Sequence, residues 1–153
     1  MKKYISKHTI PLPLYKKITS LIPIVYVDLV IVYNGKFLLT RRKNKPARGH
    51  WWLIGGRIFH GEKIETAVKR KVREEATIKN VESMIFLGFD QLFFKNGRFG
   101  EPMHAVSLLF LVHVASENRE AFGSDGELGW FSKINKRWPS YVRKWLKNAD
   151  IKS

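Results

Sequence analysis

GGRIFHGEKIETAVKRKVREEATI, residues 55–78, is the most informative stretch of this chain. Two glycines open it, Glu62 follows, and a helix expected over residues 63–77 then carries Arg70, Glu74 and Glu75 close together. Glycines let a backbone approach a ligand closely, and carboxylates suit Mg²⁺, which keeps several waters and bridges to substrate phosphates. The stretch therefore indicates a site for a divalent cation beside a phosphate.

A helical wheel of this segment shows an unusual arrangement of charge. At roughly 100° per residue, one broad apolar face contains Ile64, Ala67, Val68, Val72, Ala76 and Ile78. Lys71 and Glu75 lie inside the same arc, and Arg70 and Glu74 lie at its edge. Charges that point towards the protein must be paired or bind a cation, because burying a bare charge costs several kcal/mol. The simpler alternative is a Lys71–Glu75 ion pair at i,i+4, worth about 0.3–0.5 kcal/mol when exposed.

Length and composition predict one globular domain, residues 1–153, with 44% hydrophobic residues available for a core. The chain has no cysteine, which excludes disulfides, thiolate zinc sites and a cysteine nucleophile. The longest apolar run, residues 21–33, contains Asp28 and is shorter than the roughly 18 residues of a membrane span. The basic start lacks an apolar signal core, so we expect a cytoplasmic protein without a membrane partner.

The net charge of +15 and the pI of about 10.2 would attract nucleotides, RNA or acidic lipid. The charges are scattered along the chain, so solubilising surface charge explains them equally well. Residues 136–147, KRWPSYVRKWLK, have the basic and aromatic composition of an RNA-binding track. The favoured interpretation of this segment is an amphipathic terminal helix that packs Trp138, Tyr141 and Trp145.

The order of elements predicts an α/β sandwich with a mixed sheet. Beside the central helix, we expect helices over residues 12–22 and 140–148, and strands over 25–33, 36–41, 51–54, 81–94, 104–115 and 128–131. Asn34-Gly35 is a strong hairpin signal between the first two strands. We expect the third strand to end at Gly55-Gly56, and residues 115–126 to form a polar loop.

The charged stretch resembles the motif of the Nudix hydrolases, which is Gly, five residues, Glu, seven residues, then Arg-Glu-apolar-any-Glu-Glu-any-Gly-apolar. This chain has Gly56, Glu62 and RKVREEATI at residues 70–78, at the same spacing. Lys71 replaces a glutamate of the motif, and Thr77 replaces its last glycine. The resemblance implies a Nudix-type α/β/α sandwich and a metal-dependent hydrolase that acts on a nucleoside diphosphate linked to another moiety.

The same resemblance assigns roles to residues of the motif. Glu74 and Glu75 would bind Mg²⁺ or Mn²⁺, the Gly55 carbonyl would be a further ligand, and Arg70 would orient a motif carboxylate. Glu62 would support the junction between loop and helix, although an acid at a helix N-terminus is also favoured by the helix dipole alone.

A closer resemblance covers residues 27–57, VDLVIVYNGKFLLTRRKNKPARGHWWLIGGR, which is similar to the GDP-mannose mannosyl hydrolase branch. That branch also departs from the standard motif where Lys71 stands. The resemblance implies that Asp28 contacts the sugar and that Arg42 and Arg57 contact the diphosphate; arginine makes forked, permanently charged hydrogen bonds to phosphate. The alternatives are a structural hydrogen bond for Asp28 and a solvated hairpin end for Arg42.

The general base is the least defined part of the site. The branch uses a late histidine, but the comparable residues 124–131, SDGELGWF, contain none. Asp125 or Glu127 is the candidate base there, and a solvated acidic loop is the alternative. His104 is interpreted as an ordinary strand-end residue. One of Trp51 and Trp52 is expected in the core, and the other could line a cleft.

Three functions remain open at this point. The first is hydrolysis of a nucleotide sugar by water attack on the sugar carbon, and the second is the ordinary attack at phosphorus by a Nudix pyrophosphatase. The third is a non-catalytic Nudix-fold module that binds nucleotide or RNA, with Lys71 as an internal cation paired to Glu74 and Glu75. A small-molecule nucleotide is the expected partner, and a homodimer is possible.

Overall fold

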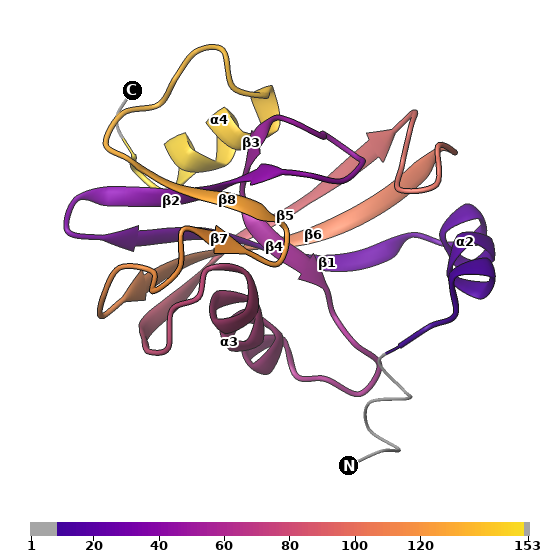
Figure 1. Ribbon diagram of the computed structural model, residues 1–153, viewed down its shortest axis with the longest axis horizontal. Helices are drawn as coiled ribbons and strands as arrows, with labels where there is room; N and C mark the ends of the chain where they lie inside the picture. Colours follow the sequence, from indigo (N-terminus) through magenta and orange to yellow (C-terminus); the bar gives the residue numbers. More distant parts are fainter. Residues whose placement is uncertain (1–8, 152–153) are drawn as a thin grey trace.

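The computed structural model describes residues 9–151, in which a mixed sheet lies between two helices, with a third helix at one end of the sheet (Figure 1). The helices are α2 (Leu12–Leu21), α3 (Ile64–Glu75) and α4 (Ser140–Asn148). The strands are β1 (Ile24–Tyr33), β2 (Lys36–Arg42), β3 (Trp51–Trp52), β4 (Ile54–Arg57), β5 (Val81–Phe94), β6 (Met103–Val114), β7 (Phe122–Gly123) and β8 (Gly126–Phe131). The α/β sandwich expected from the sequence is confirmed.

The sheet is built around β1. Within residues 9–151 its strand order is β5-β6-β1-β2-β8-β7, with β3 paired to β2 and β4 paired to β1. β1 runs parallel to β6 and antiparallel to β2 and β4, so the sheet is mixed. Its side chains alternate between the two faces: Val27, Leu29 and Ile31 pack with residues of α3, and Val30 packs with residues of α4. All four are fully buried.

Helices α3 and α4 each cover an apolar core of their own. On the α3 side, the buried residues of the helix segment are Ala67, Val68, Val72, Ala76 and Ile78. On the α4 side they include Trp138, Tyr141, Val142, Trp145 and Leu146. The aromatic residues of the basic C-terminal segment are therefore core residues, which supports their interpretation as packing groups and removes them as stacking platforms for RNA.

The structure corrects three details of the sequence-based expectations. Gly55 and Gly56 do not end a strand: they lie within β4, opposite Asp28 and Val27 of β1, while the tryptophans form the separate β3. The expected polar loop contains the short strand β7, which pairs back onto β8. Ile64, expected on the apolar face of the helix, starts α3 and is 39% exposed.

Several expectations stay predictions. Residues 1–8 and 152–153 lie outside the described part of the chain, so the basic start and the single domain over residues 1–153 are not tested. None of the helices within residues 9–151 is long and apolar enough to span a membrane. The homodimer is not tested either, although the edge strand β5 carries exposed apolar side chains, namely Ile85, Phe86, Phe89 and Phe93.

Candidate functional site

A buried ion-pair network ties the glycine-containing loop to α3. Arg70 Nε donates to Glu62 Oε1 at 2.6 Å, and its Nη2 donates to the Arg57 carbonyl at 2.9 Å. The Phe59 amide donates to Glu62 Oε2 at 2.9 Å, and the Arg70 guanidinium lies 3.7 Å from the centre of the Phe59 ring. Arg70 also reaches Glu74 Oε2 at 3.1 Å. Glu62 thus holds the junction between loop and helix, as the resemblance implies.

Lys71 lies between the two carboxylates that the sequence assigns to a metal. Its ammonium nitrogen is 2.8 Å from Glu75 Oε1 and 3.9 Å from Glu74 Oε2. Glu75 is 7% exposed, and its Oε2 atom is buried with no hydrogen-bond partner among residues 9–151. Burial raises the pKa of Glu75, and the charge of Lys71 opposes that rise. The wheel correctly placed Lys71 and Glu75 on the inward face.

The consecutive glycines of β4 let polar groups approach from both faces of the strand. A Cβ at Gly55 would collide with Asp28 Oδ1, and a Cβ at Gly56 would lie 2.5 Å from Lys71 Nζ. Because successive residues of a strand point to opposite faces, only backbone separates Asp28 on one side from Lys71 on the other. Any larger residue here would push one of these groups away.

A cleft of about 660 Å³ opens beside Lys71 and Glu75. Its charged lining consists of five cationic residues, Arg42, Lys45, Arg57, Lys71 and Arg98, and two acidic residues, Glu75 and Asp125. Arg42 Nη1 binds Asp125 Oδ2 at 2.9 Å, and Arg42 Nε donates to the Pro46 carbonyl at 2.7 Å. Burial raises the pKa of Asp125, while the neighbouring cations Arg42, Lys71 and Lys43 oppose the rise. The excess of positive charge suits an anionic ligand.

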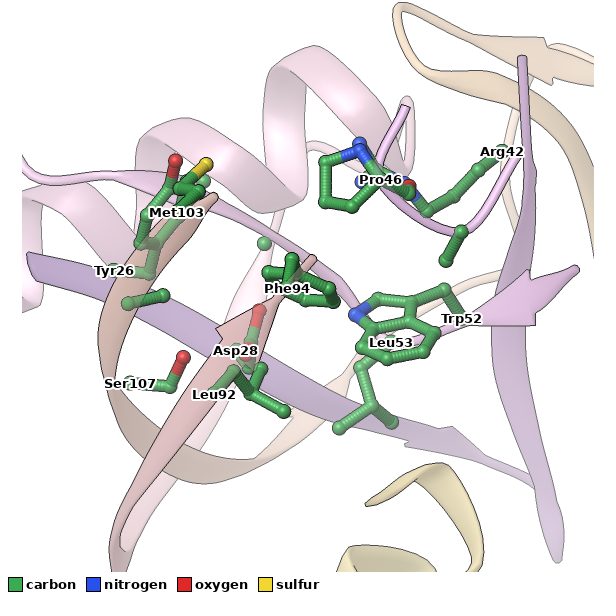
Figure 2. A pocket seen from close by; sticks show the side chains of 14 residues that line it. Tyr26, Asp28, Arg42, Pro46, Trp52, Leu53, Leu92, Phe94, Met103 and Ser107 are labelled. Atoms are coloured by element: carbon green, nitrogen blue, oxygen red, sulfur yellow. The ribbon is translucent and has the colours of Figure 1, made fainter. Parts of the chain in front are cut away.

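A smaller inner pocket of about 70 Å³ adjoins the cleft and contains Asp28 (Figure 2). Asp28 is 6% exposed, and the Tyr141 hydroxyl of α4 donates to its Oδ2 at 2.6 Å. Trp52 lines this pocket and stacks on Tyr141, with ring centroids 5.2 Å apart. Arg42 borders both the pocket and the cleft. The arrangement offers a carboxylate acceptor at the base of an aromatic recess.

The burial of Asp28 leads to a prediction about stability. Burial raises the pKa of Asp28 above its ordinary value of 3.8, with the hydrogen bond from Tyr141 opposing the rise. The folded protein therefore binds the carboxyl proton of Asp28 more tightly than the unfolded chain does. The protonated carboxyl adds to the free energy of unfolding at low pH, and this contribution is lost as pH rises through the raised pKa. Asp28→Asn has no carboxyl group to ionise, so it does not lose stability in this way as pH rises. Its melting temperature relative to wild type should increase from about pH 4 to about pH 7, as measured by thermal unfolding.

The exposed Ser116→Ala, which changes no titratable group, serves as the control for this measurement, because its change in melting temperature should be the same at both pH values. If the melting temperature of Asp28→Asn relative to wild type stays constant or falls between the two pH values, the pKa of Asp28 is not raised.

The structure does not bring every candidate residue to the cleft. Glu127 is exposed on β8, opposite Arg41, and does not line it. The Glu74 side chain is 45% exposed and does not line the cleft, although it contacts Arg70 and lies 3.9 Å from Lys71. His104 shares a 3.0 Å hydrogen bond with Gln91 and stacks on Phe93, away from the cleft lining, as a strand-end residue would. Trp51 packs against Phe131.

Three residues of the site were missed by sequence reasoning. Tyr141 was interpreted as a packing residue, although it also holds Asp28 across 113 positions of sequence. Tyr15 and Arg98 line the cleft, and the Arg57 guanidinium lies 5.5 Å from the Tyr15 ring centre. No pattern in the sequence marks these residues, because their contacts join segments that are distant along the chain.

Thr77 occupies the position where the Nudix motif has its last glycine. Its φ of 56° lies in the left-handed region, which favours glycine after a helix and is strained for a β-branched residue. The threonine is held there by the loop that follows β6: its Oγ1 accepts from the Glu120 amide at 3.1 Å, and its carbonyl accepts from Arg119 Nε at 3.2 Å. The departure from the motif therefore keeps the local backbone geometry.

The expected metal can be tested against these residues. The free Oε2 atom of Glu75 offers one ligand, but Lys71 occupies Oε1 and Arg70 binds Glu74. Residues 9–151 contain no group of three or more histidine or acidic side chains arranged for a metal. The donor set as arranged does not fit a preformed site for a dication, so Mg²⁺ or Mn²⁺ at Gly55, Glu74 and Glu75 stays a prediction.

Comparisons with known proteins agree with this architecture. The NUDIX domain pattern matches residues 23–142. Low-salt glycan biosynthesis protein Agl8 of Haloferax volcanii is 30% identical over 138 residues, which are 89% of this chain and 88% of that protein. The ADP-ribose pyrophosphatase of Methanocaldococcus jannaschii is 32% identical over 119 residues, which are 74% of this chain and 63% of that protein.

A solved structure gives the same result. The MutT NUDIX hydrolase of Burkholderia pseudomallei superimposes with a TM-score of 0.68 at 30% identity, over 83% of this chain and 98% of that one. Together, the loop–helix network around Arg70, the mixed sheet between two helices and these matches lead to one conclusion: this chain belongs to the NUDIX domain family.

Proposed function

We propose that this protein hydrolyses a nucleotide sugar, a nucleoside diphosphate linked to a sugar, in the cleft beside Lys71. The observation that carries the proposal is the cleft lining, where five cationic side chains lie together with the half-buried Asp125, whose pKa is raised by burial. A diphosphate is the anion that such a lining suits, because arginine and lysine stabilise phosphate oxygens through charged hydrogen bonds. The Haloferax relative, named for glycan biosynthesis, agrees with a sugar-linked substrate.

The residues divide the work according to their chemistry. Arg57 and Arg42 would bind the diphosphate, and Arg42 Nη2 makes no hydrogen bond within residues 9–151. Asp28 would accept a sugar hydroxyl in the adjoining pocket if the ligand displaces or shares the Tyr141 hydrogen bond. Asp125 would take the proton from the attacking water. Of the two candidate bases, Asp125 is preferred because it lines the cleft and Glu127 does not.

The bond that breaks would be the one between the sugar carbon and the diphosphate oxygen. A water oxygen attacks the sugar carbon, its proton passes to Asp125, and the bonding electron pair leaves with the diphosphate. The surrounding cations would stabilise the charge that develops on the leaving group. Family members generally use a divalent metal, but here Lys71 and Arg70 already bind the motif carboxylates Glu75 and Glu74.

Attack at phosphorus is the second candidate, and the archaeal ADP-ribose pyrophosphatase relative favours it. A non-catalytic nucleotide-binding module is the third, favoured by the Lys71–Glu75 ion pair that already neutralises the motif carboxylate. All three share the cationic cleft, so only the products distinguish them.

The decisive experiment is hydrolysis in heavy-oxygen water with a panel of nucleotide sugars and ADP-ribose. Both products are analysed by mass spectrometry, with and without Mg²⁺ or Mn²⁺. We expect the label in the free sugar, together with an unlabelled nucleoside diphosphate. Label in a phosphate group, with a sugar phosphate and a nucleoside monophosphate as products, would overturn attack at carbon. Absence of turnover under every condition would favour the binding module.

A further inference from the structure

The Lys71 ammonium group is held in one place from two sides. From its own helix, Glu75 binds it at 2.8 Å and Glu74 lies 3.9 Å away. From the sheet, Gly56 leaves just enough room, because a Cβ there would lie 2.5 Å from the nitrogen. The side chain is only 14% exposed, yet it lines the cleft. Such a lysine loses little further conformational entropy when a ligand binds.

The charges around Lys71 determine what the cleft attracts. Among residues 9–151, the lining of the cleft contains five cationic residues and two acids, Glu75 and Asp125. Asp125 is itself paired with Arg42. The cleft therefore carries a net positive charge, which attracts an anion and repels a free dication.

The position of the ammonium group matters as much as its charge. It stands between Glu74 and Glu75, the carboxylates that the motif resemblance assigns to a metal, and an ammonium group offers three donors. Glu75 takes one of them at hydrogen-bond distance. The remaining donors are available to a phosphate oxygen in the cleft, so Lys71 can meet the anion where a metal would meet it.

We propose that Lys71 is a built-in cation that binds the diphosphate of a nucleotide directly, so that this cleft binds nucleoside diphosphates without a divalent metal. The proposal rests on the proposed function, because it concerns the same cleft. In diphosphate binding, the Lys71 side chain would supply the positive charge that a metal otherwise supplies.

The test is calorimetric titration of GDP and ADP into the full chain, in EDTA and in excess MgCl₂. Wild type should bind at least one of them equally well in both buffers. In EDTA, Lys71→Gln should weaken that binding at least about tenfold, the effect of losing one charged hydrogen bond. Lys69→Glu, which reverses a charge on the exposed side of the same helix, should change it little.

A second measurement uses Mn²⁺ alone, followed by the relaxation of water protons. Wild type should bind Mn²⁺ weakly, and Lys71→Glu should bind it at least about tenfold more tightly, because a carboxylate replaces the repelling ammonium group. Circular dichroism melts check that each variant is folded, and the neutral Lys71→Gln keeps the test valid if Lys71→Glu does not fold. Mn²⁺ affinity unchanged in both variants would contradict the proposal.

The outcomes separate this inference from the proposed function. GDP or ADP binding by wild type that requires Mg²⁺, or binding in EDTA that Lys71→Gln leaves unchanged, overturns the inference even if nucleotide sugars are hydrolysed. Metal-independent binding that depends on Lys71, without turnover of any substrate, upholds the inference and overturns the hydrolase. Absence of nucleotide binding in either buffer overturns both.

Discussion

Asp125→Asn is expected to slow the hydrolysis of the nucleotide sugar by about a hundredfold or more, because general bases contribute about 10²–10⁴ to such reactions. The asparagine keeps the size of the side chain but cannot take a proton from water. Steady-state kinetics of the variant should show the loss mainly in kcat. Because Asp125 also pairs with Arg42, a smaller change in KM is expected as well.

The pH dependence separates a base from a structural partner of Arg42. Burial raises the pKa of Asp125, so the acid limb of the wild-type profile should lie at higher pH than for an ordinary aspartate. The ionised form is active, and activity should therefore rise as pH increases through the raised value. In Asp125→Asn this limb should disappear. Glu127→Gln is the matched control, since its carboxylate lies outside the cleft, and its rate should stay within about twofold of wild type.

Two results would contradict the assignment of Asp125 as the general base. If Asp125→Asn keeps the wild-type rate and the acid limb, the loop before β8 does not supply the base, whichever bond is cut. If Glu127→Gln is the slower variant, the cleft described here is not where the water is activated.

Arg70→Ala is expected to destabilise the fold by about 3–5 kcal/mol, the usual cost of removing one partner of a buried ion pair. The Arg70 side chain is 9% exposed and that of Glu62 only 4%, so the substitution removes a guanidinium that binds a buried carboxylate. It also removes the hydrogen bond to the Arg57 carbonyl and the contact with Phe59. Urea unfolding monitored by tryptophan fluorescence measures the loss.

The control for this prediction is Arg73→Ala on the same helix. Arg73 is exposed, so its replacement should change the free energy of unfolding by no more than about 0.5 kcal/mol. Equal effects of the two substitutions would mean that the Glu62–Arg70 network does not hold the loop to α3.

Much of this architecture follows from local patterns. The β-branched run of β1, the Asn34-Gly35 turn and the periodicity of α3 were sufficient to predict a mixed α/β sandwich. The wheel also predicted that Lys71 and Glu75 point inward, because the angle between residues on one helix does not depend on what surrounds it. The resemblance to the Nudix motif implied a role for Glu62 at the junction of loop and helix and an ion pair between Arg70 and a motif carboxylate, and the structure joins these two residues directly.

Local patterns did not reveal where the glycines and the loop acids lie. Gly55 and Gly56 look like a strand end because glycine usually interrupts strands, but pairing with β1 overrides that preference. Asp125 and Glu127 are indistinguishable in sequence, two positions apart. Only the turn between β7 and β8 directs Asp125 to Arg42, while Glu127 faces solvent.

The charges of the α3 motif, the apolar faces and the order of the elements can all be read along the chain, because each depends on near neighbours. The pairing of Tyr141 with Asp28 and the gathering of Arg42, Arg57, Arg98 and Asp125 into one cleft cannot. These contacts join segments that are up to 113 residues apart, and they form only when the strands of the sheet, their connecting turns and α4 are packed together. Local sequence constrains dihedral angles and faces, whereas long-range contacts depend on how the whole sheet and its helices pack.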